Sequence, residues 1–529
     1  MAPDGFRRRR HGFRGRRPPL RRECPALAGR EDRMDPAPDP SRSPSDAENG
    51  SRPEVAAAPS GPPHSPLGEV WAIAWPTVLT MMSYTVMQFV DALMVSRVDA
   101  ISVAGQGNGG VWSFTIISFL FGIVTMVNTY VSQNVGAGRR AEAARYAWSG
   151  LWLSAIAWTV LLLPFGFVMP SIFRAMHGDD PRLVELETSY AQVLLFGGIV
   201  TLSTKAVSQF FFGIHRPRVI TVAAIVGNVV NGIGNFILIY GEEGVPAWHL
   251  PGIPGTPALG VTGAAISTVI GTAVEGAIPF CLFLSRRVDA EYGTRSSWRF
   301  DPARVRDILR LGWPNALQIS NEIICWAIFM SYLVGLFGSL HLVAGWGTLR
   351  YMHMAFMPAV GFSVATTSLV GKYIGAGQPD VAAHRARLGV GMAMVYMTVC
   401  GILIAVFREP LLTLFTMGER TSPEDAAEIL RIGGGMMICA AVFQTFDALG
   451  IVYSGALRGA GDTIFPGLVT VALSWTVIVG GGWWLATRHP ELSSLGPWVA
   501  SASYIILLGF AMAARFESGR WRRIALLKK

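Results

Sequence analysis

The chain carries two versions of one sequence pattern, about 239 residues apart. Residues 131–144 read VSQNVGAGRRAEAA, and residues 370–383 read VGKYIGAGQPDVAA. Upstream of these segments, Pro76 recurs as Pro314 at a spacing of 238, each directly after a tryptophan. Two halves with matching landmarks indicate an internal duplication. In membrane proteins built from such repeats, the substrate site lies between the repeats.

The composition indicates that both halves lie in a membrane. Mean hydropathy is +0.40 and only 15% of the residues are charged, against about 25% in soluble proteins. Between about residue 70 and residue 516 the sequence contains twelve apolar stretches of roughly 20 residues or more, each long enough to cross a bilayer. We therefore predict an all-α polytopic membrane protein with twelve transmembrane helices in two pseudo-symmetric six-helix bundles.

The ends and the middle of the chain differ in composition from these bundles. Residues 1–33 hold 11 arginines and 4 acids, and the first 64 residues offer little to bury, so we expect a disordered tail. Met34 is an alternative start. The predicted divisions are an Arg/Pro-rich cytoplasmic tail (1–64), a first bundle (65–285), a basic cytoplasmic linker (286–307), a second bundle (308–516) and a basic cytoplasmic tail (517–529).

Charge asymmetry predicts the orientation. Arginines concentrate in every second junction, most densely between residues 286 and 310, whereas the loop from Gly241 to Gly260 has two glutamates and no lysine or arginine. By the positive-inside rule, the basic junctions and both termini are cytoplasmic. An even number of spans agrees with this placement.

Several function classes find no support in the sequence. The five cysteines have neither pairing nor metal-ligand spacing, and no nucleophile motif or phosphate loop is present, so we predict neither an enzyme nor a cofactor. The Arg-rich tail is an alternative site for nucleic acid or anionic lipid. A solvated tail is the commoner outcome, and we predict no nucleic-acid partner.

Two acids lie deep in predicted spans of the second half. Glu322 follows the Pro314 position by eight residues, and Asp447 precedes Leu457 by ten, which is roughly 15 Å along a helix. A charge near the bilayer centre costs at least about 2.5–3.5 kcal/mol on insertion scales, so it usually faces a cavity or a partner. Two adjacent carboxylates can share a proton, hold Na⁺ or attract a cationic compound. We predict an ion-coupling site at Glu322 and Asp447.

Three further ionisable residues lie within predicted spans of the first half. Asp91, Lys205 and Glu275 are candidates for ion coupling or for a polar cavity lining. Each has an alternative interpretation: Asp91 as a solvated residue at a helix end, Lys205 as a side chain that snorkels to the interface, and Glu275 as a structural partner of a neighbouring helix.

Neutral polar and helix-breaking residues add two predictions. Asn228, Asn231 and Asn235 share one helix face, where they either line the cavity or bond a neighbouring helix. Pro76 and Pro314 should kink their helices, as packing kinks or as bends that move during transport. The Gly-Ala-Gly segments at 136–138 and 375–377 should end two helices through left-handed glycine.

Several segments together resemble the multidrug and toxic compound extrusion (MATE) family, and within it the bacterial NorM-type branch. The resemblance covers about residues 66–516. The matching segments are 89–91 (FVD), 136–139 (GAGR), 231–241, 257–265, 443–447 and 455–463.

The resemblance implies roles for particular residues. Asp91 falls on the family's first-half carboxylate, which is linked to proton coupling and drug release, and Asn231 and Asn235 fall on its polar partners. Glu322 and Asp447 fall on acidic positions that resemble a second-half cation site, where Na⁺ is one candidate ligand.

Two positions depart from what the family leads us to expect. Lys205 aligns with Asp447 through the internal repeat, at a spacing of 242, and is not a family hallmark; facing a cavity, it would alter ion choice. Phe443 stands one turn before Asp447, where some relatives have a hydroxyl-bearing aromatic, and this weakens the case for Na⁺.

Together these features predict an antiporter of the bacterial inner membrane, acting as a monomer among membrane lipids. It would export small organic, often cationic, drugs or toxic metabolites in exchange for Na⁺ or H⁺. One alternative is a lipid-linked precursor flippase of the wider superfamily, and another is a channel or membrane-anchored binding module.

Overall fold

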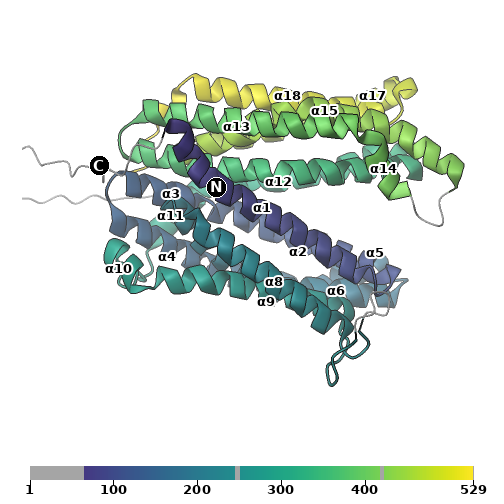
Figure 1. The fold of residues 1–529 in the computed structure, drawn as a ribbon, viewed down its shortest axis with the longest axis horizontal. Coiled ribbons are helices and arrows are strands. Elements are labelled where there is room, and N and C mark those ends of the chain that lie inside the picture. Colours follow the sequence, from purple (N-terminus) through teal and green to yellow (C-terminus); the bar gives the residue numbers. More distant parts are fainter. Residues whose placement is uncertain (1–64, 245–250, 417–421, 528–529) are drawn as a thin grey trace, which may run out of the picture. The chain divides into compact units, whose positions relative to one another are not determined.

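The computed structural model of the protein describes residues 65–244, 251–416 and 422–527. The predictions for the tail at 1–64, including the alternative start at Met34, fall outside the described residues. All regular elements of the described part are helices (Figure 1). Short π-helical or 3₁₀ stretches, labelled η, interrupt or extend several of them.

The first half contains ten α-helices and one π-helical stretch among its described residues. They are α1 (Pro66–Val95), α2 (Ala100–Val124), α3 (Met126–Gly136), α4 (Arg140–Ala157), η1 (Trp158–Leu162), α5 (Leu163–His177), α6 (Pro181–Phe196), α7 (Gly198–Gly213), α8 (Pro217–Tyr240), α9 (Gly260–Phe283) and α10 (Arg286–Tyr292).

The second half contains the remaining elements. Its elements are α11 (Pro302–Ile328), η3 (Phe329–Val334), η4 (Gly335–Phe337), α12 (Ser339–Gly375), α13 (Pro379–Val406), α14 (Arg408–Thr416), α15 (Pro423–Ala460), α16 (Ile464–Leu473), η5 (Ser474–Gly481), α17 (Gly482–Arg488), η6 (Pro490–Leu492), α18 (Leu495–Glu517) and η7 (Arg520–Arg523).

The predicted twelve transmembrane spans are confirmed. Eleven described helices are long and apolar enough to cross a membrane, and several of these combine two adjacent elements, such as α2 with α3. The bent pair α6 and α7, at 44° to each other, supplies the twelfth span. The predicted linker at 286–307 holds α10 and the first turns of α11, because Asp301 caps that helix and Pro302 occupies its first position.

The two Gly-Ala-Gly segments end helices as predicted. Gly138 and Gly377 have φ of 75° and 71°, in the left-handed region that glycine adopts without strain. Backbone bonds of 2.8 Å from Arg139 to Asn134 and of 2.7 Å from Gln378 to Tyr373 close the two ends. Equivalent positions therefore form the same capping structure in both halves.

These helix ends also form a reciprocal contact between the halves. A Cβ on Gly136 of α3 would lie 1.9 Å from the carbonyl oxygen of Lys372 on α12. A Cβ on Gly375 of α12 would lie 1.9 Å from the carbonyl oxygen of Gln133 on α3. Gln133 and Lys372 are themselves equivalent at the repeat spacing of 239. In each half, the absence of a side chain at the glycine therefore allows the backbone of the other half to approach closely.

A second reciprocal pair lies further along the same interface. A Cβ on Gly122 of α2 would lie 2.6 Å from the Cα of Ala316 on α11, and one on Gly361 of α12 would lie 2.7 Å from the Cα of Val78 on α1. We call the contacts at Gly122, Gly136, Gly361 and Gly375 the glycine seam.

One edge of the seam is held by a carboxylate on α1. Glu69 accepts hydrogen bonds from Lys372 Nζ at 3.0 Å and from the Tyr373 hydroxyl at 2.7 Å, both on α12. Arg385 Nε on α13 donates to the same carboxylate at 2.8 Å. Two cations and a phenol of the second half therefore hold one acid of the first.

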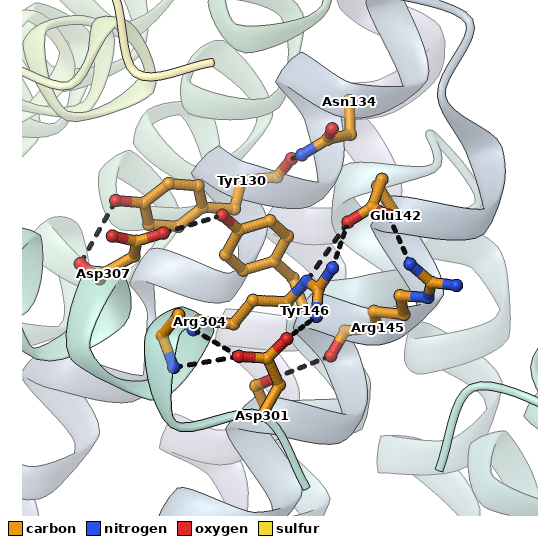
Figure 2. A network of polar contacts seen from close by, with 10 residues as sticks. Tyr130, Asn134, Glu142, Arg145, Tyr146, Asp301, Arg304 and Asp307 are labelled. Atoms are coloured by element: carbon orange, nitrogen blue, oxygen red, sulfur yellow. Dashed lines mark hydrogen bonds and ion pairs between the residues drawn. The ribbon is translucent and has the colours of Figure 1, made fainter. Parts of the chain in front are cut away.

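The other edge carries Asp307 of α11, which is equivalent to Glu69 at a spacing of 238. Figure 2 shows its surroundings. The Tyr146 hydroxyl donates to Asp307 Oδ2 and the Tyr130 hydroxyl to its backbone carbonyl, both at 3.1 Å. The two tyrosine rings stack at 4.4 Å. One turn earlier, Arg304 of α11 binds Glu142 of α4 at 2.8 Å.

Candidate ion and substrate sites in the two halves

Asp91 forms a buried cluster with two of the predicted asparagines. Its side chain lies on α1 and is 7% exposed. Asn235 Nδ2 on α8 donates to Asp91 Oδ1 at 2.5 Å, and the Asn231 amide, oriented toward the carboxylate, donates at 2.8 Å. The interpretation of Asp91 as a solvated residue at a helix end is therefore wrong. Tyr190 of α6, which the sequence did not single out, is close enough to interact electrostatically with the same carboxylate.

The shared face of the three asparagines is confirmed. Asn228 donates to Ser83 Oγ on α1. It therefore lies on the same face of α8 as Asn231 and Asn235, whose amides bind Asp91 of α1. Asn231 also lies beside Thr268 of α9. The α8 face is thus bonded to both neighbouring helices. This fits the packing interpretation directly, while a role as cavity lining stays a prediction.

Lys205 and Glu275 meet in a second cluster of the first half. Lys205 Nζ on α7 lies 3.6 Å from Glu275 Oε1 on α9 and donates to the Tyr84 hydroxyl of α1 at 3.0 Å. Tyr84 in turn donates to Glu275. The ammonium is also 4.1 Å from the centroid of the Tyr84 ring. The partnered interpretation of Glu275 fits this geometry, and Lys205 has an internal partner.

Glu322 and Asp447 are brought together in the second half. Glu322 lies on α11 and Asp447 on α15, both are half-buried, and their carboxylates are close enough to interact electrostatically. Tyr504 of α18, 2% exposed, interacts with both. Among the described residues, no cationic side chain acts on either carboxylate. When ionised, the pair would therefore have no protein counter-ion among the described residues.

The donor set fits an exchangeable ion better than a tightly held metal. Within the described ranges, no group of three or more His, Cys, Asp or Glu side chains gathers in a way that could hold a metal ion. Two carboxylates and a phenol can hold a proton, or can bind Na⁺ when water or backbone carbonyls complete its shell. Phe443, one turn before Asp447, is fully buried and adds no oxygen.

Pro76 and Pro314 lie inside α1 and α11, which continue through them. Threonines bond the nearby carbonyls: Thr221 Oγ1 donates to the Pro76 carbonyl, and Thr463 Oγ1 to that of Leu311, both at 2.8 Å. The backbone bonds that the two prolines remove are those to the carbonyls four residues earlier, of Ala72 and Arg310, so these threonines add bonds near each proline without replacing the lost ones. The kinks and their movement stay predictions.

Comparisons with known proteins agree with this arrangement. The sequence profile of the MatE family matches the chain twice, at residues 76–237 and 319–481. These two segments cover more than half of the chain, one in each half. The duplication inferred from the repeated landmarks therefore corresponds to two copies of the family's own unit.

One curated relative and two solved structures illustrate the similarity. The probable multidrug resistance protein NorM of Synechococcus sp. is 28% identical over 448 residues, which is 84% of this chain and 92% of that protein. A Pyrococcus furiosus transporter of the MOP superfamily, described as having a binding pocket of reversed polarity, has a TM-score of 0.77 at 20% identity over 87% of this chain and 97% of its own.

The second structure, an outward-facing multidrug resistance MATE transporter, has a TM-score of 0.75 at 20% identity over 87% of this chain and 97% of its own. Both structures share the twelve-helix fold. Together with the double profile match, these likenesses assign the chain: it belongs to the MatE family of multidrug efflux transporters, which are membrane-spanning transport proteins and not enzymes.

Proposed function

We propose that the protein exports small organic, often cationic, compounds in exchange for inward movement of Na⁺ or H⁺. The observation that carries this proposal is the pair Glu322 and Asp447, two interacting carboxylates within transmembrane spans that no described cation neutralises. An uncompensated pair of this kind is costly in a membrane. A transported ion is the simplest source of the missing positive charge.

Competition for the same charge would couple the two movements. An organic cation and the coupling ion are both attracted to the carboxylates, and binding of one weakens binding of the other. Asp91, held by Asn231 and Asn235, supplies a second buried carboxylate in the first half. We propose that it takes up a proton or ion when substrate is released.

The energy source is sufficient for such exchange. Each charge that moves inward across 100 mV provides about 2.3 kcal/mol. We propose that both termini face the cytoplasm of a bacterial inner membrane, in agreement with the basic junctions, and that a single chain transports. Rocking of the two halves about the glycine seam would alternate access to the sites.

Efflux of ethidium from proteoliposomes, with Na⁺ and pH gradients imposed separately, tests the proposal. We expect efflux under one of the two gradients, and we expect it to fall at least about tenfold in Glu322→Gln and in Asp447→Asn. Asp91→Asn should retain ethidium binding but lose release. Glu491→Gln, at a 66% exposed side chain in η6, is the matched control and should transport normally.

Two results would overturn the proposal. The first is no gradient-driven efflux of ethidium or any other organic cation from correctly inserted protein, which would favour the flippase alternative. The second is full gradient-driven efflux in all three variants, which would leave the family assignment intact but remove these residues from coupling.

A further inference from the structure

The charged clusters of the two halves occupy equivalent positions in the duplicated fold. Tyr84 of α1 and Glu322 of α11 are 238 residues apart, and Lys205 of α7 and Asp447 of α15 are 242 apart. The third member of each cluster, Glu275 on α9 or Tyr504 on α18, lies on the last span of its half. Each cluster therefore joins the first, fourth and sixth spans of its own bundle.

The two clusters contain the same groups except for one. Each has a phenol and a carboxylate, although these exchange helices: Tyr84 with Glu275 in the first half, Tyr504 with Glu322 in the second. The remaining member is Lys205 in the first half and Asp447 in the second. The first cluster is formally neutral, whereas the second carries two negative charges when ionised.

Lys205 has the surroundings expected of a bound cation. Its ammonium lies 3.0 Å from the Tyr84 hydroxyl and 3.6 Å from Glu275 Oε1, and 4.1 Å from the centroid of the Tyr84 ring. The lysine side chain is 23% exposed and that of Glu275 is 6% exposed. The ammonium thus neutralises a nearly inaccessible carboxylate, which a soluble ion would otherwise have to reach.

We propose that Lys205 is a built-in counter-ion: its ammonium takes, in the first half, the place that the coupling ion takes at Glu322 and Asp447 in the second. Of the two equivalent clusters, only the one in the second half then exchanges an ion. Lys205 therefore determines how many ions accompany each substrate. This inference rests on the function proposed above.

Removal of the lysine charge should create an ion site. Without its ammonium, Glu275 becomes an uncompensated carboxylate in a span, and such a group recruits a proton or another cation. Lys205→Asp goes further, because the first cluster would then hold two acids and a phenol, as the second does. Lys205→Met leaves one acid, and Lys205→Arg keeps the charge.

The test counts bound ions directly. Equilibrium binding of ²²Na⁺ and proton uptake in weakly buffered detergent are measured for purified wild type, Lys205→Asp, Lys205→Met and Lys205→Arg. We expect Lys205→Asp to bind one more ion per chain than wild type and Lys205→Arg to bind the same number. We expect a gain in Lys205→Met as well, and adding Glu275→Gln to Lys205→Met should remove that gain, because no acid then remains in the first cluster.

Control variants separate the two proposals. Glu322→Gln with Asp447→Asn should remove the part of wild-type binding that depends on these two acids and leave the extra ion of Lys205→Asp in place. Wild-type protein that binds no ion sensitive to Glu322 or Asp447 would defeat the proposed function. Wild-type binding that is intact, with no gain in folded Lys205→Asp or Lys205→Met, would defeat this inference alone. Should Lys205→Asp misfold, the Lys205→Met result decides.

Discussion

The two edges of the glycine seam hold the halves together at equivalent positions by different means. On one edge Glu69 alone binds Lys372, Tyr373 and Arg385. On the other, the Asp307 carboxylate accepts a hydrogen bond from one tyrosine hydroxyl, and the ion pair between the halves is formed one turn away by Arg304 and Glu142. The duplicated backbone thus preserves the contact, while its polar chemistry has diverged.

This difference predicts unequal sensitivity to mutation. Loss of the Glu69 carboxylate leaves two cations of the second half without their shared partner. Loss of Glu142 on the other edge leaves Arg304 still paired with Asp301 of its own helix. The Glu69 edge therefore depends on one residue, whereas on the Asp307 edge the loss of Glu142 leaves no cation without a partner.

The largest effect is expected at the seam itself. Gly136→Ala or Gly375→Ala places a Cβ 1.9 Å from a backbone carbonyl oxygen, and overpacking of this kind costs about 1–3 kcal/mol or more. Both variants should favour the open seam equally, roughly tenfold or more, and slow transport. Spin labels at exposed Arg287 and Gln378, on a cysteine-free background, report the distance between the halves. Gly391→Ala, with nothing within 4 Å, is the control.

The second largest effect is expected for Glu69→Gln, which should destabilise the closed seam by about 1–3 kcal/mol. Arg385 is only 13% exposed and loses its charged partner in this variant. The same label pair should report a larger open population. Glu517→Gln removes a more exposed pair with Arg387 within the second half and should change little. An unchanged distance distribution in Glu69→Gln would refute the asymmetry between the edges.

An intermediate effect is expected at His215, between α7 and α8. Its Nε2 donates to the Ser368 carbonyl across the interface at 3.2 Å. Burial, and then the charge of Lys372, lower its pKa to about 3. The unfolded state, with a pKa of about 6.5, therefore binds a proton that the native state does not. Stability present above pH 6.5 is lost as pH falls, by at most about 1.4 kcal/mol per pH unit.

His215→Asn removes this titration and keeps a residue that tolerates its φ of 61°. Thermal unfolding in detergent at pH 7.5 and pH 5.5 compares the two proteins. Wild type should lose more stability than the variant on acidification. An equal loss in both would mean that His215 is protonated in the native state or does not contribute.

The smallest effect is expected on the Asp307 edge. Asp307→Asn and Glu142→Gln should each cost less than about 1 kcal/mol, because a neutral amide still accepts the Tyr146 hydroxyl bond and Asp301 still binds Arg304. Distance distributions near those of wild type are expected for both. A shift as large as that of Glu69→Gln would show that the two edges are equally important.

Much of the fold followed from sequence because its signals are local. Apolar length gives the spans, and Gly138 and Gly377 end their helices through their own backbone conformation. The seam was not predicted. Gly122 and Gly361 recur in the sequence, but close approach of a neighbouring backbone leaves no mark on the glycine itself. Nor does hydropathy reveal that the span holding α6 and α7 is bent.

The sites followed a similar rule. A charged residue within an apolar span is visible in the sequence, so Asp91, Glu322 and Asp447 could be singled out. Their partners could not, because Tyr84, Tyr190 and Tyr504 are ordinary residues of membrane helices. The interpretation of Lys205 depended on Tyr84, 121 residues away, and on Glu275, 70 residues away. Only the folded chain brings these three groups together.

The reciprocal contact of Gly136 and Gly375 has a genetic consequence. Each glycine meets a carbonyl oxygen of the opposite half, and every amino acid carries that oxygen. A substitution at Gly136 therefore cannot be relieved by changing the side chain at position 372, nor one at Gly375 by changing position 133. Suppressors of either lesion should arise elsewhere, in residues that set the distance between the halves. A selection for restored drug resistance would find them away from the point of collision.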